Sequence, residues 1–292
     1  MTYCDFQTTA HGKWILVGEH SVVRGTSAIV FPITTKKLTL KYLATSQKFN
    51  VEYTGYTTGL EQAFWQVLKY GQHLLGKSIH YGDLHLHNTI PIGVGLGASA
   101  ALCVVIARWF VAQDFLKATE TYLLAKNLEN LFHKKSSGLD IAGASANCGI
   151  YFQQGQIYKL KQAWKPQWFL SASGQISSTA ECIDHVNNML QNNASIVTGI
   201  DAKMQACVSK ARLNLEYNEP ESLLNLATAI KEAATCFQEW GLVSMQLKQH
   251  MQTLMDYGAL AVKPTGSGKG GFVISLWDTP PPPTILTNLI AV

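Results

Sequence analysis

The pattern of apolar and polar positions predicts short strands in the first part of the chain. Apolar stretches at residues 14–17 and 27–31 are typical of two strands around a turn. Residues 38–43 and 49–53 alternate apolar and polar side chains, and we expect them to form a half-buried strand pair. Residues 80–87 alternate in the same way and predict a further strand.

Helical spacing of apolar residues is found in six further segments of the chain. The pattern predicts helices over residues 60–75, 100–115, 118–133, 200–213, 221–240 and 244–257. Further strands are expected at residues 149–152, 156–159, 168–172 and 272–277, the first two as a hairpin. The helix-rich part follows Pro166, so we expect domains at residues 1–165 and 166–292, with an extended surface segment at residues 280–283.

Composition and charge narrow the class of protein. The 292 residues are 47% hydrophobic, which is enough for a sizeable core and excludes a disordered chain. The 23 Lys and Arg against 19 Asp and Glu give a net charge of +4, too mild to indicate a nucleic-acid or membrane partner. We find no membrane-span pattern, no signal peptide and no C-x-x-C pair, so we expect a cytoplasmic protein with reduced thiols.

A glycine-rich segment at residues 91–99 carries the strongest chemical signal. Gly93, Gly95 and Gly97 allow positive φ and close approach of the backbone to a ligand, and a predicted helix follows at once. A helix N-terminus behind such a loop suits phosphate groups. The spacing matches neither a P-loop nor the dinucleotide fingerprint. A tight loop in which glycine serves only packing is the alternative.

Two further groups of polar residues accompany apolar segments. Lys13 precedes the strand at residues 14–17, and Glu19 and His20 follow it. An ordinary strand with solvated flanks is the alternative, and it is favoured for Glu19 and His20 taken alone. Glu129 lies in an otherwise apolar predicted helix, and Asp140 follows a short turn. A carboxylate among leucines needs a partner, a metal ion or a proton, unless it lies on a solvated helix face.

Together, these segments resemble the GHMP kinases. The first family motif is similar to residues 12–25, the second to residues 91–101 and the third to residues 263–271. Residues 137–140 resemble the family's P-S-G-x-D motif, with Glu129 eleven residues upstream. The matches occur in order and span residues 12–271, so chance similarity is a poor explanation.

The resemblance implies a two-domain α+β fold, in which a ribosomal-protein-S5-like N-terminal α/β domain precedes a helix-rich, ferredoxin-like α+β domain and ATP binds between them. It implies that ATP contacts Pro91, Gly93, Val94, Gly95, Leu96, Gly97, Ala98 and Ser99. Ser99 and Glu129 are expected to hold Mg²⁺. Asp140 is expected to accept or orient the proton of the acceptor hydroxyl, while Lys13 keeps Asp140 ionised and steadies the transferring phosphoryl group.

Within the family, the first motif is most similar to that of mevalonate kinases. Phosphomevalonate kinases more often carry Tyr at the position of His20, and Thr265 agrees with the mevalonate kinase form of the third motif. The resemblance implies that mevalonate and ATP are the partners and 5-phosphomevalonate, an intermediate of isoprenoid biosynthesis, is the product. Glu19, His20, Thr265 and Gly266 are expected to line the acceptor site. No nucleic-acid or membrane partner is expected, and a homodimer is left open.

The sequence departs from the family pattern in ways that keep alternatives open. Ala98 replaces the first serine of the usual pair, Ser136 replaces a proline, and Lys269 interrupts the last glycine run, where it could meet a phosphate or water. The acceptor could instead be phosphomevalonate or a sugar. A nucleotide-binding protein without catalysis is the more distant alternative, and the presence of Lys13 together with both carboxylates argues against it.

Overall fold

The computed structural model describes residues 5–45, 48–133 and 136–292. The chain forms two compact units, the first from residues 1–13 and 32–147 and the second from residues 14–31 and 148–292. The strands β1 (Phe6–Val17) and β2 (Ser27–Ala44) therefore contribute to both. The predicted domain boundary between residues 165 and 166 stays a prediction.

The first unit is built from a sheet and helices. It adds the strands β3 (Phe49–Gly55) and β4 (Gly82–Asn88) and the helices α1 (Leu60–Leu75), α2 (Ala98–Ala112), α3 (Thr121–Glu129) and α4 (Leu139–Ser145). A short 3-10 helix, η2 (Ala118–Glu120), precedes α3. The helix predicted over residues 118–133 is therefore shorter than expected, because its regular part ends at Glu129.

The strand pairing in this unit differs from the prediction. β3 pairs in parallel with β4, and β4 pairs antiparallel with the second part of β2, so the strand order is β3-β4-β2. The expected pairing of residues 38–43 with residues 49–53 is wrong. The helix α1 connects β3 with β4, and a helical crossover of this length is what parallel neighbours require.

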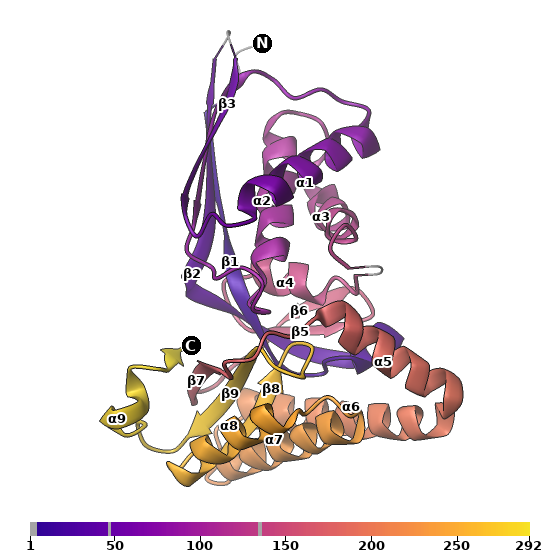
Figure 1. The fold of residues 1–292 in the computed structure, drawn as a ribbon, viewed down its shortest axis with the longest axis vertical. Coiled ribbons are helices and arrows are strands. Elements are labelled where there is room, and N and C mark those ends of the chain that lie inside the picture. Colours follow the sequence, from indigo (N-terminus) through magenta and orange to yellow (C-terminus); the bar gives the residue numbers. More distant parts are fainter. Residues whose placement is uncertain (1–4, 46–47, 134–135) are drawn as a thin grey trace. The chain divides into compact units, whose positions relative to one another are not determined.

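Helix α2 forms the centre of the first unit, between the sheet and its neighbouring helices (Figure 1). Most of its residues are buried, and Trp109 packs against Tyr42 of β2 with ring centroids 5.3 Å apart. Its one cation, Arg108, donates to the carbonyl of Thr9 at 2.6 Å and to that of Ser145 at 3.1 Å. Each fully buried large apolar side chain contributes about 1.5–3 kcal/mol. The helix is thus firmly anchored, and so is the glycine-rich loop at its N-terminus.

The second unit combines the first part of β2 with two further sets of strands and a group of long helices. Its strands are β5 (Ile150–Gln153), β6 (Gln156–Lys159), β7 (Gln167–Ala172), β8 (Ala261–Thr265), β9 (Phe272–Trp277) and β10 (Ile290–Ala291). Its helices are η1 (Ser21–Arg24), α5 (Thr179–Asn192), α6 (Ala194–Glu216), α7 (Ser222–Glu239), α8 (Met245–Asp256) and α9 (Pro283–Leu286). β5 pairs with β2 and with β6, which confirms the predicted hairpin.

A four-stranded antiparallel sheet in the order β10-β7-β9-β8 packs against the helices α7 and α8, and α6 packs on α7 (Figure 1). Trp14 of β1 stacks on Phe31 with ring centroids 4.8 Å apart, and it packs edge-on against Trp168 of β7 with ring centroids 5.5 Å apart. In the part of the chain that the structure describes, no helix is both long and apolar enough to cross a lipid bilayer.

Candidate active site

The glycine-rich loop at residues 91–97 has an unusual backbone and leads straight into α2. Gly93, Gly95 and Gly97 have φ values of 80°, 85° and 82°, a region that favours glycine because L side chains clash there. Gly93 and Gly95 are exposed, whereas Leu96 is buried and holds the loop on the core. Ala98 and Ser99 are the first two residues of α2. The residues predicted to contact ATP therefore form one loop and one helix start, and their role stays a prediction.

Lys13 connects this loop to the carboxylates. Its backbone N–H donates to the carbonyl of Leu96 at 2.9 Å, and its side chain lies against Gly97. A Cβ added at Gly97 would meet the Cγ atom of Lys13 at 2.7 Å. The ammonium of Lys13 then reaches Asp140, the second residue of α4, with an Nζ to Oδ2 distance of 3.0 Å. The structure thus brings the two predicted catalytic residues together.

The turn before α4 is held by close packing. Gly138 has a φ of 89°, and a Cβ at this position would lie 2.1 Å from the hydroxyl of Tyr122. The hydroxyl of Ser136 accepts from the backbone N–H of Gly138 at 3.0 Å. Ser136, which stands where the family pattern has proline, therefore orders the turn that carries Asp140.

Glu129 is the last residue of α3, and its side chain is only 1% exposed. One carboxylate oxygen, Oε2, accepts a short hydrogen bond from Ser136, while Oε1 has no hydrogen-bond partner among the described residues. Burial and, to a lesser extent, the nearby charge of Asp140 raise the pKa of Glu129 to about 8, while Ser136 and Lys13 oppose the shift. A buried carboxylate with one unsatisfied oxygen is chemically suited to a cation.

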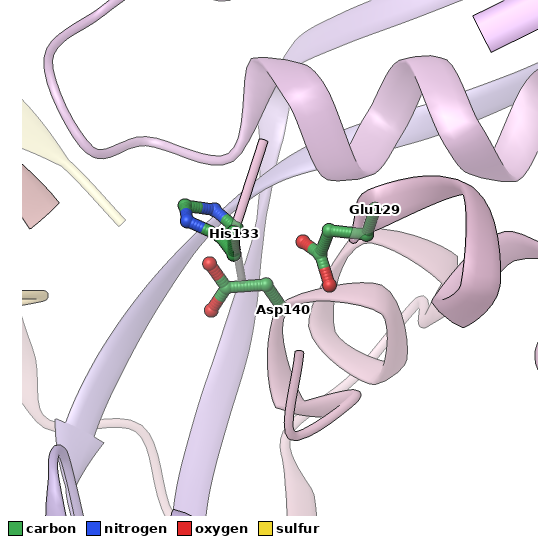
Figure 2. Close-up of side chains that lie close together, drawn as sticks. All are labelled: Glu129, His133 and Asp140. Carbon is green, nitrogen blue, oxygen red and sulfur yellow. The ribbon is translucent and has the colours of Figure 1, made fainter. Parts of the chain in front are cut away.

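His133 completes this cluster and was not predicted. Ligand atoms of Glu129, His133 and Asp140 all lie within 4.8 Å of one another. Figure 2 shows the three side chains. Burial lowers the pKa of His133, and the carboxylate of Asp140 partly opposes this. The signal in the sequence was the four-residue spacing between Glu129 and His133, which places both side chains on one side of a helical turn.

The remaining predicted site residues lie in the second unit. Glu19 follows the end of β1 and is buried, where it forms an ion pair with Lys263 of β8, whose side chain is also fully buried. Burial raises the pKa of Glu19 and lowers the pKa of Lys263, while the pairing opposes both shifts. The sequence indicates Lys263 only as part of the third motif, and no sequence signal pairs two residues so far apart.

His20 and Thr265 are both held by backbone groups. The Nε2 atom of His20 lies 2.9 Å from the carbonyl of Ser267, and its ring packs against Trp240 at 5.5 Å. Burial lowers the pKa of His20 to about 4, so the ring is neutral near pH 7. The hydroxyl of Thr265 bonds to both the N–H and the carbonyl of Ile15, each at 2.9 Å. Thr265 therefore ties β8 to β1, and its contact with an acceptor stays a prediction.

The third motif loop has the same backbone character as the second. Gly266 and Gly268 have φ values of 95° and 83°, and Lys269 adopts a φ of 59° although it is not glycine. The backbone N–H of Lys269 donates to the carbonyl of Leu242 at 2.6 Å, which fixes this conformation. Gly266, a predicted acceptor residue, is half-buried directly after β8.

Comparisons with known proteins agree with the motifs. Residues 61–148 match the family model described as GHMP kinases N terminal domain. The mevalonate kinase of Thermococcus sibiricus is 26% identical over 295 residues, which cover 92% of this chain and 88% of that protein. The solved structure of L. major mevalonate kinase in complex with R-mevalonate has a TM-score of 0.78 at 23% identity, covering 94% of this chain and 87% of that one.

The chain is also similar to kinases with a different named ligand. Streptococcus pneumoniae phosphomevalonate kinase in complex with phosphomevalonate and AMPPNP has a TM-score of 0.73 at 14% identity, covering 94% of this chain and 93% of that one. The match of residues 61–148 to the family model and the α+β fold shared with the solved kinases confirm the resemblance to the GHMP kinases seen in the motifs. The curated relative is a mevalonate kinase, but the fold is shared by both kinds of kinase and does not decide the acceptor.

Proposed function

We propose that the chain is an ATP-dependent kinase that transfers the γ-phosphoryl group to the primary hydroxyl of mevalonate, giving 5-phosphomevalonate. The observation that carries this proposal is the contact of Lys13 with Asp140, at 3.0 Å, directly beneath the glycine-rich loop. A phosphate-binding loop, a buried lysine and a carboxylate are the parts that phosphoryl transfer to an alcohol needs. The choice of mevalonate follows the relatives that match over most of the chain.

Each group has a distinct proposed role. The backbone N–H groups at the start of α2 and its positive dipole end hold the phosphates of ATP. Asp140 accepts or orients the proton of the acceptor hydroxyl as the oxygen attacks the γ-phosphorus. Lys13 balances the charge of Asp140 and then that of the transferring phosphoryl group.

The residues also fit a Mg²⁺ ion. The unpartnered, buried oxygen of Glu129 is a hard ligand of the kind that Mg²⁺ prefers, and Ser99 supplies a hydroxyl from the first turn of α2. Bound Mg²⁺ would neutralise negative charge on the β- and γ-phosphates. Glu129 and Ser99 are therefore the residues proposed to hold it.

The acceptor selectivity is proposed to depend on His20. Mevalonate carries one carboxylate and no phosphate, whereas phosphomevalonate brings about two further negative charges that normally require extra Lys or Arg. A neutral imidazole suits a hydroxyl or a single carboxylate.

An ATP-consumption assay with separate acceptors tests the proposal. We expect consumption with mevalonate and much less with phosphomevalonate, galactose or homoserine. Nucleotide binding without acceptor-dependent consumption would instead support a non-catalytic nucleotide-binding protein.

A further inference from the structure

The cluster beside Asp140 contains a nitrogen ligand that the proposed Mg²⁺ chemistry does not use. We infer that Glu129, His133 and Asp140 form a binding site for a borderline divalent transition-metal ion, best represented by Zn²⁺, which binds without nucleotide. The ligand atoms of these three residues lie within 4.8 Å of one another. The inference concerns metal binding to the free protein, so it goes beyond the proposed function and needs no catalytic activity.

The unpartnered oxygen of Glu129 is the observation that points to a ligand. The residue is 1% exposed, and its Oε1 atom has no hydrogen-bond partner within the described ranges of the chain. Leaving a buried polar group unsatisfied costs about 1–3 kcal/mol, and more for a charged group. Figure 2 shows the three side chains close together, with the carboxylate of Asp140 beside the ring of His133. A cation there would satisfy the oxygen that the protein leaves without a partner.

The donor set favours Zn²⁺ over Mg²⁺. An imidazole nitrogen suits zinc and its neighbours in the first transition row, whereas Mg²⁺ takes oxygen ligands and retains water. Zinc bonds to His and carboxylate ligands of about 2.0–2.2 Å place the ligand atoms of a tetrahedral site about 3.3–3.6 Å apart. The ligand atoms of the cluster lie within 4.8 Å of one another, so side-chain adjustments of about 1 Å would close them around the ion.

Zinc bound here would compete with two other contacts. The Nζ atom of Lys13 lies 3.0 Å from Oδ2 of Asp140. A metal ion bound to the same carboxylate would be repelled by the ammonium of Lys13. Removing that positive charge should therefore strengthen zinc binding. Glu129 is also a proposed Mg²⁺ ligand, so Zn²⁺ should inhibit phosphoryl transfer and excess Mg²⁺ with ATP should relieve the inhibition.

Isothermal titration of the metal-depleted, nucleotide-free protein with ZnCl₂ tests the inference. We expect one tight site in the wild type and at least about tenfold weaker binding in His133→Asn, because a direct ligand is lost. Co²⁺ provides a second probe, since its visible spectrum reports nitrogen and oxygen ligands and should change in the same variant. His133→Gln, checked by circular dichroism, guards against a folding defect in the first substitution.

A double variant at a second pair of histidines provides the matched control. His85 and His87 lie on one face of β4, where both contact the hydroxyl of Thr54 at 3.1 and 2.9 Å, and such a surface pair could bind zinc by itself. His85→Asn with His87→Asn should leave the tight site intact, and Lys13→Met should strengthen it. Equal zinc affinity in the wild type and His133→Asn would overturn the inference, as would loss of the site in the double variant. The titration contains neither ATP nor acceptor, so its result is independent of the proposed function.

Discussion

Replacing Gly97 with alanine should displace the lysine of the candidate site without changing any charge. The added Cβ would lie 2.7 Å from Cγ and 3.1 Å from Cε of Lys13, and the first distance is too short for two carbon atoms. Lys13 is only 3% exposed and its Nζ atom is 3.0 Å from Asp140, so the side chain has little space into which to move without lengthening this contact. Gly97→Ala therefore tests whether the placement of Lys13 matters for transfer.

The loss of stability can be estimated from two backbone effects, and the loss of rate from the displacement of Lys13. An L residue at the φ of 82° observed here costs about 1–2 kcal/mol relative to glycine. Alanine also lowers the conformational entropy of the unfolded chain, which offsets about 0.4–1 kcal/mol of this loss of stability. The net loss of stability from the backbone is then about 1 kcal/mol, or about 2–4 °C in Tm, before the added clash. A displacement of about 1 Å in a catalytic group can lower the rate about 10²-fold, so we expect a loss of that order in kcat.

Gly95→Ala is the matched control. Its φ is 85°, and nothing lies within 4 Å of a Cβ added there, so it carries the same backbone strain without the contact with Lys13. Both variants should weaken ATP binding, since both change the predicted phosphate loop. Steady-state kinetics and thermal unfolding of the two proteins should show a much larger fall in kcat for Gly97→Ala. Equal losses of kcat would refute the reasoning, because the contact with Lys13 would then have no consequence.

Three further substitutions test individual roles. Asp140→Asn should keep ATP binding but lower phosphoryl transfer by about 10²–10⁴-fold, as measured by calorimetry and single-turnover kinetics. Glu129→Gln should raise the Mg²⁺ concentration required for activity and weaken Mg·ATP more than free ATP. The pKa of Glu129 in the folded protein, about 8, exceeds its usual value of 4.5. The free energy of unfolding of the wild type should therefore fall as the pH rises from 4.5 to about 8, because the folded state holds this proton more tightly than the unfolded state. Denaturant titrations of Glu129→Gln should show a smaller fall. His20→Leu should raise the KM for mevalonate far more than the Kd for ATP, and parallel changes in both would contradict its assignment to the acceptor.

The sequence predicted local elements well wherever one periodicity dominated. The segments around α1, α2, α6, α7, α8 and the hairpin of β5 and β6 lie where the apolar spacing placed them. The pairing of strands was harder to predict, because an alternating pattern predicts a strand but does not identify the strand beside it. The pairing of β3 with β4 depends on the crossover through α1 rather than on the side chains of either strand.

The candidate site was predictable as a set of residues but not as a set of contacts. The pair of Lys13 and Asp140 could be expected only through the family resemblance, since 127 residues separate them along the chain. His133 was not predicted because it lies in none of the family motifs, although its four-residue spacing from Glu129 indicated a shared side of a helical turn. The burial of Lys263 against Glu19 could not be predicted from the sequence, because charged residues are normally exposed.

A direct competition between acceptors tests the central claim most sharply. The wild-type protein is supplied with limiting ATP, Mg²⁺ and equal concentrations of mevalonate and phosphomevalonate, and the phosphorylated products are quantified by ³¹P nuclear magnetic resonance and mass spectrometry. We predict that the phosphoryl group is transferred almost entirely to the primary hydroxyl of mevalonate, and that Asp140→Asn lowers the initial rate of its formation about 10²–10⁴-fold under the same conditions. Predominant phosphorylation of phosphomevalonate, or an undiminished initial rate in Asp140→Asn, would contradict this prediction.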